Sequence, residues 1–407
     1  MGELLRRFWM PVLLAEELLE PDSPPVRVRI LCENLVAFRD SDGSVGLLDE
    51  ICPHRRASLF WGRNEESGLR CVYHGWKFDT AGNCLDMPNE PAEYEFKKRV
   101  KTTAYPAVDR GGVIWAYMGP KELQPELPEL EWARVPAGHR AISKQYQINN
   151  WAQAVEGGID SSHVSFLHRQ FKARDLPEAM QRRAGTQAKY MLADTGPRFT
   201  VKRTDYGMLI GARREVGEAG YYWRISQFLA PFYTMIPGAI EPGQNISGHA
   251  WVPSDDDSTW TFSVTWNPVR PLLDEEQAVM HAEGGLYATI DAKYRPIRNA
   301  ANDYLIDRQK QKTESYTGIL GGREQDRAIQ ESMGPTVDRS LERLGTSDTA
   351  IIAYRRLLIN MARDLQQGKE PHAAFHGDAY RVRSASLVSN ESRAFDEAAR
   401  QLLVSRL

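Results

Sequence analysis

The sequence has little cysteine, almost no net charge and no long hydrophobic run. Four cysteines in 407 residues are too few for the disulfide framework of a secreted domain. Lys and Arg total 51 against 54 Asp and Glu, so no overall field favours nucleic acid or an anionic membrane. No stretch reaches the length of a membrane-spanning helix, and the segment from Arg6 to Ala15 runs into Glu16 without an export-signal cleavage site. We therefore expect a cytoplasmic protein that binds neither nucleic acid nor membrane and acts on a small, soluble molecule.

Motifs for several common chemistries are also missing. The chain has no P-loop and no G-x-S-x-G nucleophile elbow, which leaves phosphoryl transfer and serine hydrolysis without support. It has no strand-linked G-x-G-x-x-G and no C-x4-C-x2-C motif. Any NAD(P)H, flavin or plant-type ferredoxin centre that the reaction uses must therefore reside on a separate protein.

The most informative motif pairs Cys52-Pro-His54 with Cys71-Val-Tyr-His74, so that each short segment supplies one thiolate and one imidazole. In a Rieske [2Fe-2S] centre two cysteines hold one iron and two histidines hold the other. Structural zinc modules usually pair like residues instead, as C-x2-4-C and H-x3-5-H. The pattern therefore predicts a Rieske cluster with these four residues as ligands, and with it a function in electron transfer.

The length of the chain makes two domains the default expectation. Short alternating stretches separated by turn residues such as Asp40-Ser41-Asp42-Gly43 predict an all-β domain around the cluster, over residues 1–120. A Pro- and Glu-rich segment leads into a second, α+β domain over residues 121–407. In that domain we expect helical segments at 149–168, 273–314 and 348–367, a mostly helical tail at 370–407, and strands at 198–203, 207–213, 221–230 and 258–266.

The predicted helix at 149–168 carries an unusual density of metal-capable side chains, including Asp160, His163 and His168. Asp160 and His163 are i,i+3 neighbours, so the carboxylate can hydrogen-bond one ring nitrogen of the histidine while the other nitrogen binds a metal. His163 and His168 can share that metal only if the helix ends or widens between them. Two imidazoles and one carboxylate, with open positions opposite, are the ligand set of non-haem Fe(II) oxygenases.

The carboxylate of such a site must come from further along the chain. Asp303 and Asp307 lie in one candidate segment, and Asp326 lies in another, Arg323-Glu324-Gln325-Asp326-Arg327. Spacing alone does not choose among the three aspartates.

Together these motifs resemble the α subunit of a Rieske non-haem iron aromatic-ring-hydroxylating oxygenase, in the phthalate dioxygenase-like branch. The resemblance spans nearly the whole chain. One departure is Gly157, where many members of the family carry Asn. Besides the Rieske pair, the residues that carry the resemblance are Asn149-Asn150-Trp151, Glu156-x3-Asp160-x2-His163-x4-His168, Asn302-Asp303-Tyr304 and Gln325-Asp326-x4-Glu331-Ser332-Met333-Gly334-Pro335.

This resemblance implies that His163, His168 and Asp326 hold a mononuclear Fe(II), and that the second domain contains an antiparallel sheet of the helix-grip type. It also implies head-to-tail homotrimers, alone or paired as hexamers, in which Asp160 bridges His163 to His74 of the neighbouring subunit. The electrons would come from an NAD(P)H-dependent reductase of the flavin or ferredoxin type, and O2 would be the co-substrate.

The stretch from Tyr221 to Phe228 alternates as a strand, which places Tyr222, Arg224, Ser226 and Phe228 on one face. An aromatic face with one arginine suits an aryl carboxylate, because the guanidinium fork matches a carboxylate. We therefore expect cis-dihydroxylation of a phthalate, chlorobenzoate or phenoxybenzoate, with Arg224 binding the carboxylate. Monooxygenation or O-demethylation of an aryl ether is the alternative, and a non-catalytic electron carrier or an aromatic-ligand binding protein are rivals from other classes.

Overall fold

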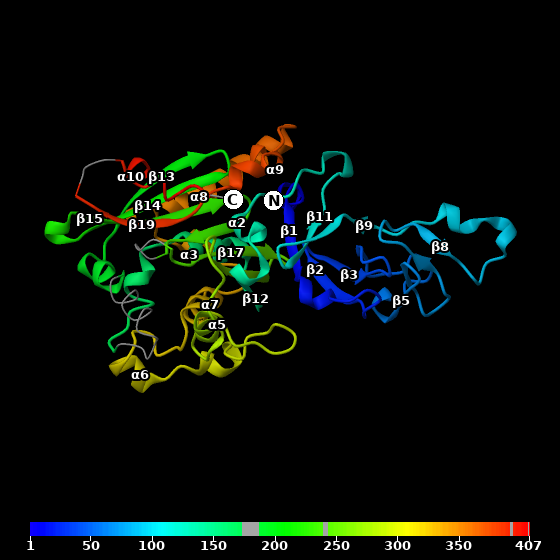
Figure 1. Cartoon of the computed structure of the whole chain (residues 1–407), viewed down its shortest axis with the longest axis horizontal. Coiled ribbons are helices and arrows are strands. Elements are labelled where there is room, and N and C mark those ends of the chain that lie inside the picture. Colours follow the sequence, from blue (N-terminus) through cyan, green and yellow to red (C-terminus); the bar gives the residue numbers. More distant parts are fainter. Residues whose placement is uncertain (173–186, 239–242, 391–393, 406) are drawn as a thin grey trace. The chain divides into compact units, whose positions relative to one another are not determined.

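The computed structural model describes residues 1–172, 187–238, 243–390, 394–405 and 407 (Figure 1). The chain forms two compact units, Met1–Pro125 with Val252–Asp255, and Glu126–Trp251 with Asp256–Leu407. The domain boundary expected from the sequence is residue 120. The sequence gives no indication that Val252–Asp255, from the middle of the chain, also belongs to the first unit. Over the described residues, no helix combines the length and the apolar character needed to cross a membrane.

The first unit is built from short antiparallel strands, in agreement with the sequence. Local polar contacts shape its turns: the Asp40 carboxylate accepts the amides of Asp42 and Ser44 at 3.1 and 2.8 Å, and Gly43 takes a positive φ of 84°. Besides the N-terminal turn α1 (Gly2–Leu5), the unit contains the sheets β1 (Trp9–Leu14), β11 (Val113–Tyr117), β10 (Ala107–Arg110); β2 (Val26–Ile30), β3 (Glu33–Arg39), β4 (Val45–Asp49), β9 (Ala104–Tyr105); and β5 (Arg63–Glu65), β6 (Gly68–Arg70), β7 (Lys77–Phe78), β8 (Cys84–Asp86).

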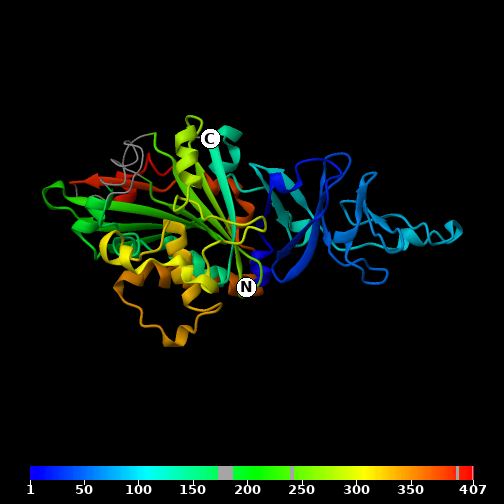
Figure 2. The same cartoon turned by 90° about the horizontal axis from the view of Figure 1, so that it is seen from below.

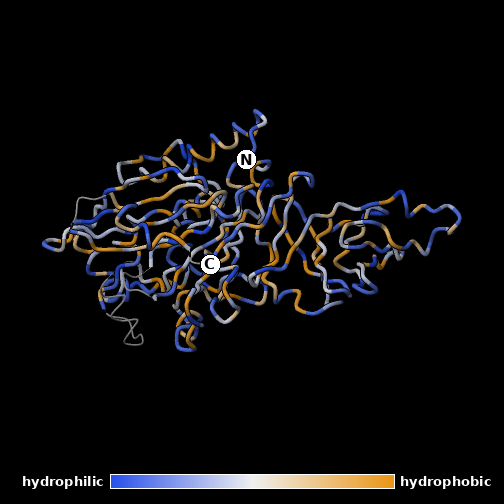
Figure 3. The backbone as a smooth tube through the Cα atoms, turned by 45° about the horizontal axis from the view of Figure 1, so that its top comes forward, coloured by the Kyte–Doolittle hydropathy of each residue, from blue (hydrophilic) through white to orange (hydrophobic). Residues whose placement is uncertain are grey.

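The hydrophobic core of the first unit contains both motif cysteines. Cys52 and Cys71 are 1% and 2% exposed, and they belong to the same buried cluster as Phe38, Leu69 and Trp76. Apolar and hydrophilic stretches alternate along the backbone (Figure 3). The two motif loops are therefore anchored in a packed core at their cysteines.

The second unit contains one eight-stranded antiparallel sheet, with one edge of β15 shared between β16 and β19. The predicted strands at 198–203, 207–213, 221–230 and 258–266 are present. The prediction of a mostly helical tail is wrong, because β19 extends the sheet and the described part of that tail contains only two short α-helices and one 3-10 helix. The strands are β12 (Arg140–Gln147), β13 (Arg198–Thr204), β14 (Gly207–Glu215), β15 (Tyr221–Leu229), β16 (Tyr233–Ile236), β17 (Ile246–Pro253), β18 (Thr259–Trp266) and β19 (Ala385–Ser389).

Helices α3 and α8 lie on the face of this sheet that carries Phe228, whereas α10 packs on the other face, where Phe395 stacks on Trp223. Helix α3 packs on β15 and β16, α8 packs on β13 and β14, and α3 also contacts both α7 and α8; Figure 2 shows these helices beside the strands. The predicted helical stretch at 273–314 is only partly helical, because α5 ends at His281, residues 282–299 contain no helix, and positive φ angles at residues 303–305 interrupt the chain again before α6. The α-helices of the unit are α2 (Glu131–Arg134), α3 (Trp151–Ile159), α5 (Asp274–His281), α6 (Arg308–Thr313), α7 (Gly322–Ser332), α8 (Thr349–Gln366), α9 (His372–Phe375) and α10 (Phe395–Ala398).

A buried carboxylate ties distant parts of the second unit together. Glu131 in α2 is fully buried, and it accepts hydrogen bonds from Trp266 Nε1 at 3.0 Å, Arg383 Nε at 2.7 Å and Ser405 Oγ at 3.0 Å. Burial would raise the pKa of Glu131, but the hydrogen bonds from Arg383 and Trp266 lower it below its usual value. The carboxylate thus stays ionised while it joins α2, β18 and the C-terminal segment.

Candidate metal centres

The two Cys/His loops of the first unit have the same backbone geometry. In each loop the cysteine amide donates to the carbonyl five residues on, and the amide four residues on donates back to the cysteine carbonyl. The returning amides belong to Arg56 and Gly75, which both have positive φ angles, of 65° and 80°. The repeated turn presents the histidine of each loop next to its cysteine.

The four candidate ligands separate into a buried thiol pair and a more exposed imidazole pair. The Cys52 thiol hydrogen-bonds the sulfur of Cys71, and this bond lowers the pKa of Cys71 to about 6. The rings of His54 and His74 lie edge to face with centroids 4.4 Å apart, and both side chains are partly exposed. Trp76 stacks on His54 at 4.3 Å and holds that ring in place.

This arrangement fits a two-iron cluster better than a single ion. The four ligands of a tetrahedral zinc ion, with bonds of about 2.0–2.3 Å, lie within about 4.6 Å of one another. In the described part of the chain, the only group of three or more metal-capable side chains within 4.8 Å is His163, His168 and Asp326, so the two loops do not converge on one point. Two thiols inside and two imidazoles outside are the donor set of a Rieske cluster.

In the second unit, the segment that carries Asp160 and His163 is not one continuous helix. Helix α3 ends at Ile159, and Asp160 leaves it in an extended conformation with φ −74° and ψ 125°. Its carboxylate then accepts the amides of Ser162 at 2.7 Å and His163 at 3.2 Å, and hydrogen-bonds His163 Nδ1 at 3.0 Å. The predicted helical i,i+3 pairing is therefore wrong as geometry, although the predicted contact between the two side chains exists.

His163, His168 and Asp326 converge. Asp326 Oδ1 lies 3.5 Å from His163 Nε2 and 3.1 Å from His168 Nε2, and all three donor atoms lie within 4.8 Å of one another. Of the other two aspartates that the spacing left open, Asp307 caps α6 by accepting the amides at positions 309 and 310, and Asp303 is exposed with a φ of 49°. The structure brings neither of them to the histidines.

The electrostatics of the triad suit a divalent cation. Burial would raise the pKa of Asp326, but the imidazoles of His168 and His163 and the guanidinium of Arg323 hold it well below its usual value. The carboxylate is therefore anionic, and the two Nε2 atoms face it. Both Nδ1 atoms are occupied, by Asp160 Oδ2 on His163 and by Gln325 Oε1 at 2.8 Å on His168. Two imidazoles and one carboxylate make a facial set for Fe(II).

The close packing of α3 against α7 and α8 positions this triad. Glu156 in α3 accepts two hydrogen bonds from Arg355 in α8, at 2.8 and 2.9 Å. At Gly157 an added Cβ would overlap Gln330 Nε2 in α7, so glycine lets the Gln330 side chain lie directly against α3. The departure from the family pattern at residue 157 therefore has a packing reason, and α7 brings Asp326 beside the end of α3.

The strand face predicted to contact substrate lies under these helices. All four residues of this face are buried: Tyr222, Arg224, Ser226 and Phe228. The ring of Phe228 packs edge to face against Tyr354 of α8. Arg224 is 6% exposed, and its Nε donates to Ser161 Oγ at 3.1 Å, one residue after Asp160. The structure thus places Arg224 against the loop that leads to His163.

Two further cations, one beside the Asp160 loop and one beside Asp326, were missed by sequence reasoning. Arg214, opposite Tyr222 in β14, donates to the Ser161 carbonyl at 2.5 Å; burial and the charge of Arg224 lower its pKa to about 10. Arg323 Nη1 lies 4.0 Å from Asp326 Oδ2, with 14% of its side chain exposed. The position of Arg214 in a mostly apolar strand could have indicated a buried charge, whereas no feature of the sequence around Arg323 indicated one.

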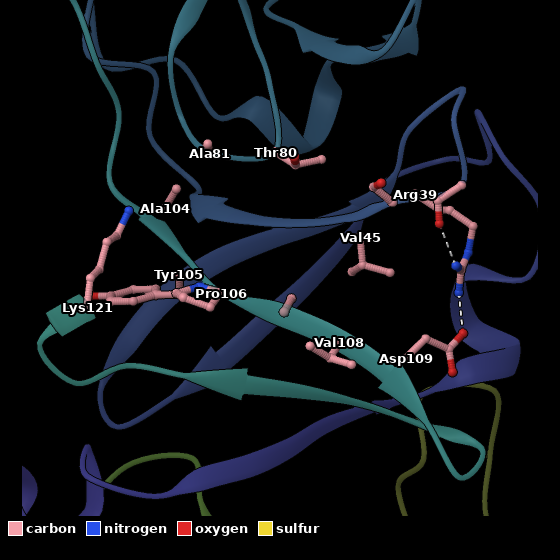
Figure 4. Close-up of a pocket in the computed structure, with 13 residues that line it drawn as sticks. Arg39, Val45, Thr80, Ala81, Ala104, Tyr105, Pro106, Val108, Asp109 and Lys121 are labelled. Atoms are coloured by element: carbon pink, nitrogen blue, oxygen red, sulfur yellow. Dashed lines mark hydrogen bonds and ion pairs between the residues drawn. The ribbon is translucent and has the colours of Figure 1, made fainter. Parts of the chain in front are cut away.

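A separate cavity of about 440 Å³ opens in the first unit (Figure 4). Its lining includes Arg39, Tyr105, Asp109 and Lys121, and it contains neither cysteine nor histidine. Arg39 forms an ion pair with Asp109 at 2.6 Å, so its charge is already compensated. This cavity is not part of either candidate metal centre.

Comparison with known proteins agrees with both centres. The Rieske [2Fe-2S] domain model matches residues 8–106, and the model described as "LigXa C-terminal domain like" matches residues 116–392. The oxygenase subunit of phthalate 4,5-dioxygenase from Pseudomonas putida is 42% identical over 378 residues, which cover 91% of this chain and 84% of that protein. The oxygenase subunit of 3-chlorobenzoate-3,4-dioxygenase from Comamonas testosteroni is 39% identical over 395 residues, covering 93% and 89%.

The fold also has a solved counterpart. The NdmA QL mutant of Pseudomonas putida CBB5, determined with theobromine, superposes with a TM-score of 0.62 at 19% identity, covering 97% of this chain and 99% of that one. The two family models and the two relatives account for nearly the whole sequence. The chain therefore belongs to the α subunits of the Rieske non-haem iron aromatic-ring-hydroxylating oxygenases, which carry a Rieske [2Fe-2S] cluster and a mononuclear iron.

Proposed function

We propose that this oxygenase cis-dihydroxylates an aryl carboxylate, with electrons from a separate NAD(P)H-dependent reductase. The chain supplies no nucleotide-binding motif of its own, and an oxygenase subunit works with a reductase. When bound, the cluster supplies single electrons and the mononuclear iron activates O2. We assign the cluster to Cys52, His54, Cys71 and His74, and the iron to His163, His168 and Asp326.

The observation that carries the carboxylate assignment is a pair of buried cations beside the Asp160 loop. Arg214 and Arg224 are 0% and 6% exposed, and within the described parts of the chain neither lies within ion-pair distance of a carboxylate, although the more distant charges of Asp160 and Asp194 act on Arg214. Burying unpaired charge is costly, and an anionic ligand is the usual compensation. A substrate carboxylate bound to Arg224 would supply that anion, and the aromatic ring of the substrate would then point toward the triad.

Each of the two arginines has a distinct role in this proposal. Arg214 donates to the backbone carbonyl of Ser161, so its position is fixed by the loop itself. Arg224 uses only its Nε, toward Ser161 Oγ, and its two terminal nitrogens make no hydrogen bond with the described residues. Those terminal N–H groups form the planar fork that binds a carboxylate bidentately. Arg224 is therefore the substrate-binding residue, and Arg214 raises the positive potential around it.

We further propose head-to-tail trimers, in which Asp160 connects the two metal centres of neighbouring subunits. Asp160 Oδ2 accepts from His163 Nδ1, Asp160 Oδ1 accepts the amide of Ser162, and the carboxylate side chain retains 27% exposure. A carboxylate with this exposure can also accept from His74 of the neighbouring subunit. The residue would then give electrons a short, hydrogen-bonded route.

Arg224→Met tests the substrate assignment. Removing one partner of a buried charge pair costs about 2–5 kcal/mol, so kcat/KM for phthalate or 3-chlorobenzoate should fall by about 30-fold or more. The corresponding amides and methyl esters should change only a few-fold. The matched control is Arg213→Met, which removes a neighbouring arginine of the same strand. The Arg213 guanidinium lies over the Tyr221 ring at 4.5 Å. Equal losses on acids and neutral analogues would remove Arg224 from the substrate site.

A further inference from the structure

Gln325 in α7 makes two hydrogen bonds that fix its orientation. The side chain is 3% exposed, and its Nε2 donates to the Ile319 carbonyl at 2.8 Å. A carbonyl can only accept, so the amide cannot be turned around without leaving two acceptors face to face. Its Oε1 therefore points at His168 Nδ1, 2.8 Å away.

An amide oxygen next to His168 determines where the ring carries its proton. Since Oε1 can only accept, Nδ1 must carry the hydrogen, and the lone pair of the neutral ring is left on Nε2. Nε2 is the atom that lies 3.1 Å from Asp326 Oδ1. Gln325 thus presents the metal-binding nitrogen of His168 to the same point as the carboxylate.

His163 is oriented in the same way by a different group. Its Nδ1 bonds Asp160 Oδ2 at 3.0 Å, and its Nε2 lies 3.5 Å from Asp326 Oδ1. The partner of His163 is an anion with 27% of its side chain exposed, whereas the partner of His168 is a neutral, fully enclosed amide. An anionic acceptor makes an imidazole a stronger donor to a metal, so the two histidines are not equivalent.

We propose that Gln325 is a positioning residue for the mononuclear iron: it holds His168 as the Nδ1–H tautomer and thereby sets how tightly the site retains Fe(II). This inference rests on the proposed role of His168 as a ligand. Loss of the partner that orients a metal-binding histidine typically weakens metal affinity about 10–100-fold. We expect that loss when the acceptor is removed.

A purely structural role of Gln325 makes a different prediction. The Nε2 bond to Ile319 ties α7 to the segment before it, where Gly321 takes a positive φ of 82°. If that anchor were the only function, every substitution that removes the amide N–H would weaken the site equally. Gln325→Glu and Gln325→Met separate the two roles, because both lose the donor to Ile319 and only glutamate keeps the acceptor for His168.

The experiment measures the Fe(II) dissociation constant of the mononuclear site by chelator competition, in full-length protein with the Rieske cluster intact. The electron paramagnetic resonance spectrum of the Fe(II)–nitric oxide adduct, recorded with the cluster oxidised, reports the ligand field independently of turnover. Gln325→Met should weaken binding about 10–100-fold and change that spectrum, whereas Gln325→Glu, which keeps an acceptor for His168 Nδ1, should bind Fe(II) more tightly than Gln325→Met. Gln227→Met is the matched control, because Gln227 is a buried glutamine of β15 whose Nε2 donates to the backbone carbonyl of Arg383 at 3.0 Å, as Gln325 does to Ile319.

His168→Ala separates failure of this inference from failure of the ligand assignment. If His168→Ala binds Fe(II) as tightly as wild type, the assignment of the iron site is wrong and the role of Gln325 falls with it. If His168→Ala loses iron but Gln325→Met keeps wild-type affinity and spectrum, only the positioning role is overturned. Equal losses in the Glu and Met variants would likewise overturn it in favour of the Ile319 anchor.

Discussion

Asp326→Ala should remove the mononuclear iron while the Rieske cluster stays in place. Asp326 Oδ1 is 3.1 and 3.5 Å from the two Nε2 atoms, and it is the only anion among the three donors. The substitution leaves two neutral imidazoles facing Arg323, whose Nη1 lies 4.0 Å from the lost carboxylate. Removing the buried anion beside a bound cation costs about 2–5 kcal/mol of binding free energy, and each 1.4 kcal/mol corresponds to a tenfold change in affinity. The Fe(II) dissociation constant should therefore rise by about 30-fold to several thousand-fold.

The assay is chelator competition for Fe(II), with the visible absorption of the cluster as the internal reference for intact protein. Asp303→Ala and Asp307→Ala are the matched controls, because the sequence offers both as the third ligand and the structure places neither beside the histidines. Both controls should keep wild-type iron affinity. Wild-type affinity in Asp326→Ala, or loss of iron from either control, would refute the reasoning from the triad.

Two further predictions concern carboxylates away from the third ligand. Asp160→Asn should retain both metals, since an amide can accept from His163 as Gln325 does from His168, but should slow cluster-to-iron electron transfer in single-turnover kinetics; wild-type rates would contradict the bridging role. Glu131→Gln should lower the free energy of unfolding by about 3–5 kcal/mol, because it leaves Arg383 buried without its anion. The folded pKa of Glu131 is depressed, so its contribution is present above the unfolded value of 4.5 and is lost as pH falls below it. In urea titrations from pH 7 to 3, the free energy of unfolding of Glu131→Gln should lack the part that wild type loses in acid. The same pH dependence in variant and wild type would contradict this role of Glu131.

Local sequence patterns predicted the first centre more completely than the second. The Cys/His loops are short, and each turn is closed by hydrogen bonds within a few residues of its cysteine. The contact between Asp160 and His163 was also predictable from proximity along the chain. The end of α3 at Ile159 was not, because the periodicity continues past the point where Asp160 turns its carboxylate back onto the amides that follow.

Residues that reach the second centre through tertiary packing had no readable signal. Asp326 and Gln325 come from α7, more than 150 residues beyond the histidines, and their placement depends on the packing of that helix against α3. Spacing could therefore offer Asp326 only as one of three aspartates. Arg214 faces the same loop as Arg224, but only the pairing of β14 with β15 brings them together. The strand β19 was missed because it pairs with a strand far earlier in the chain.

The central claim is that this α subunit hydroxylates an aryl carboxylate. The most direct test is substrate-dependent O2 consumption by the iron-loaded protein with a reductase and NADH, over a panel of phthalate, chlorobenzoates, phenoxybenzoates and their neutral amides, with products identified by mass. The proposal predicts O2 uptake coupled to a product that gains two oxygen atoms and two hydrogens, for at least one acid and not for its amide. Uptake confined to neutral aromatics, or none with any acid while the cluster is reduced and the iron is bound, would contradict it.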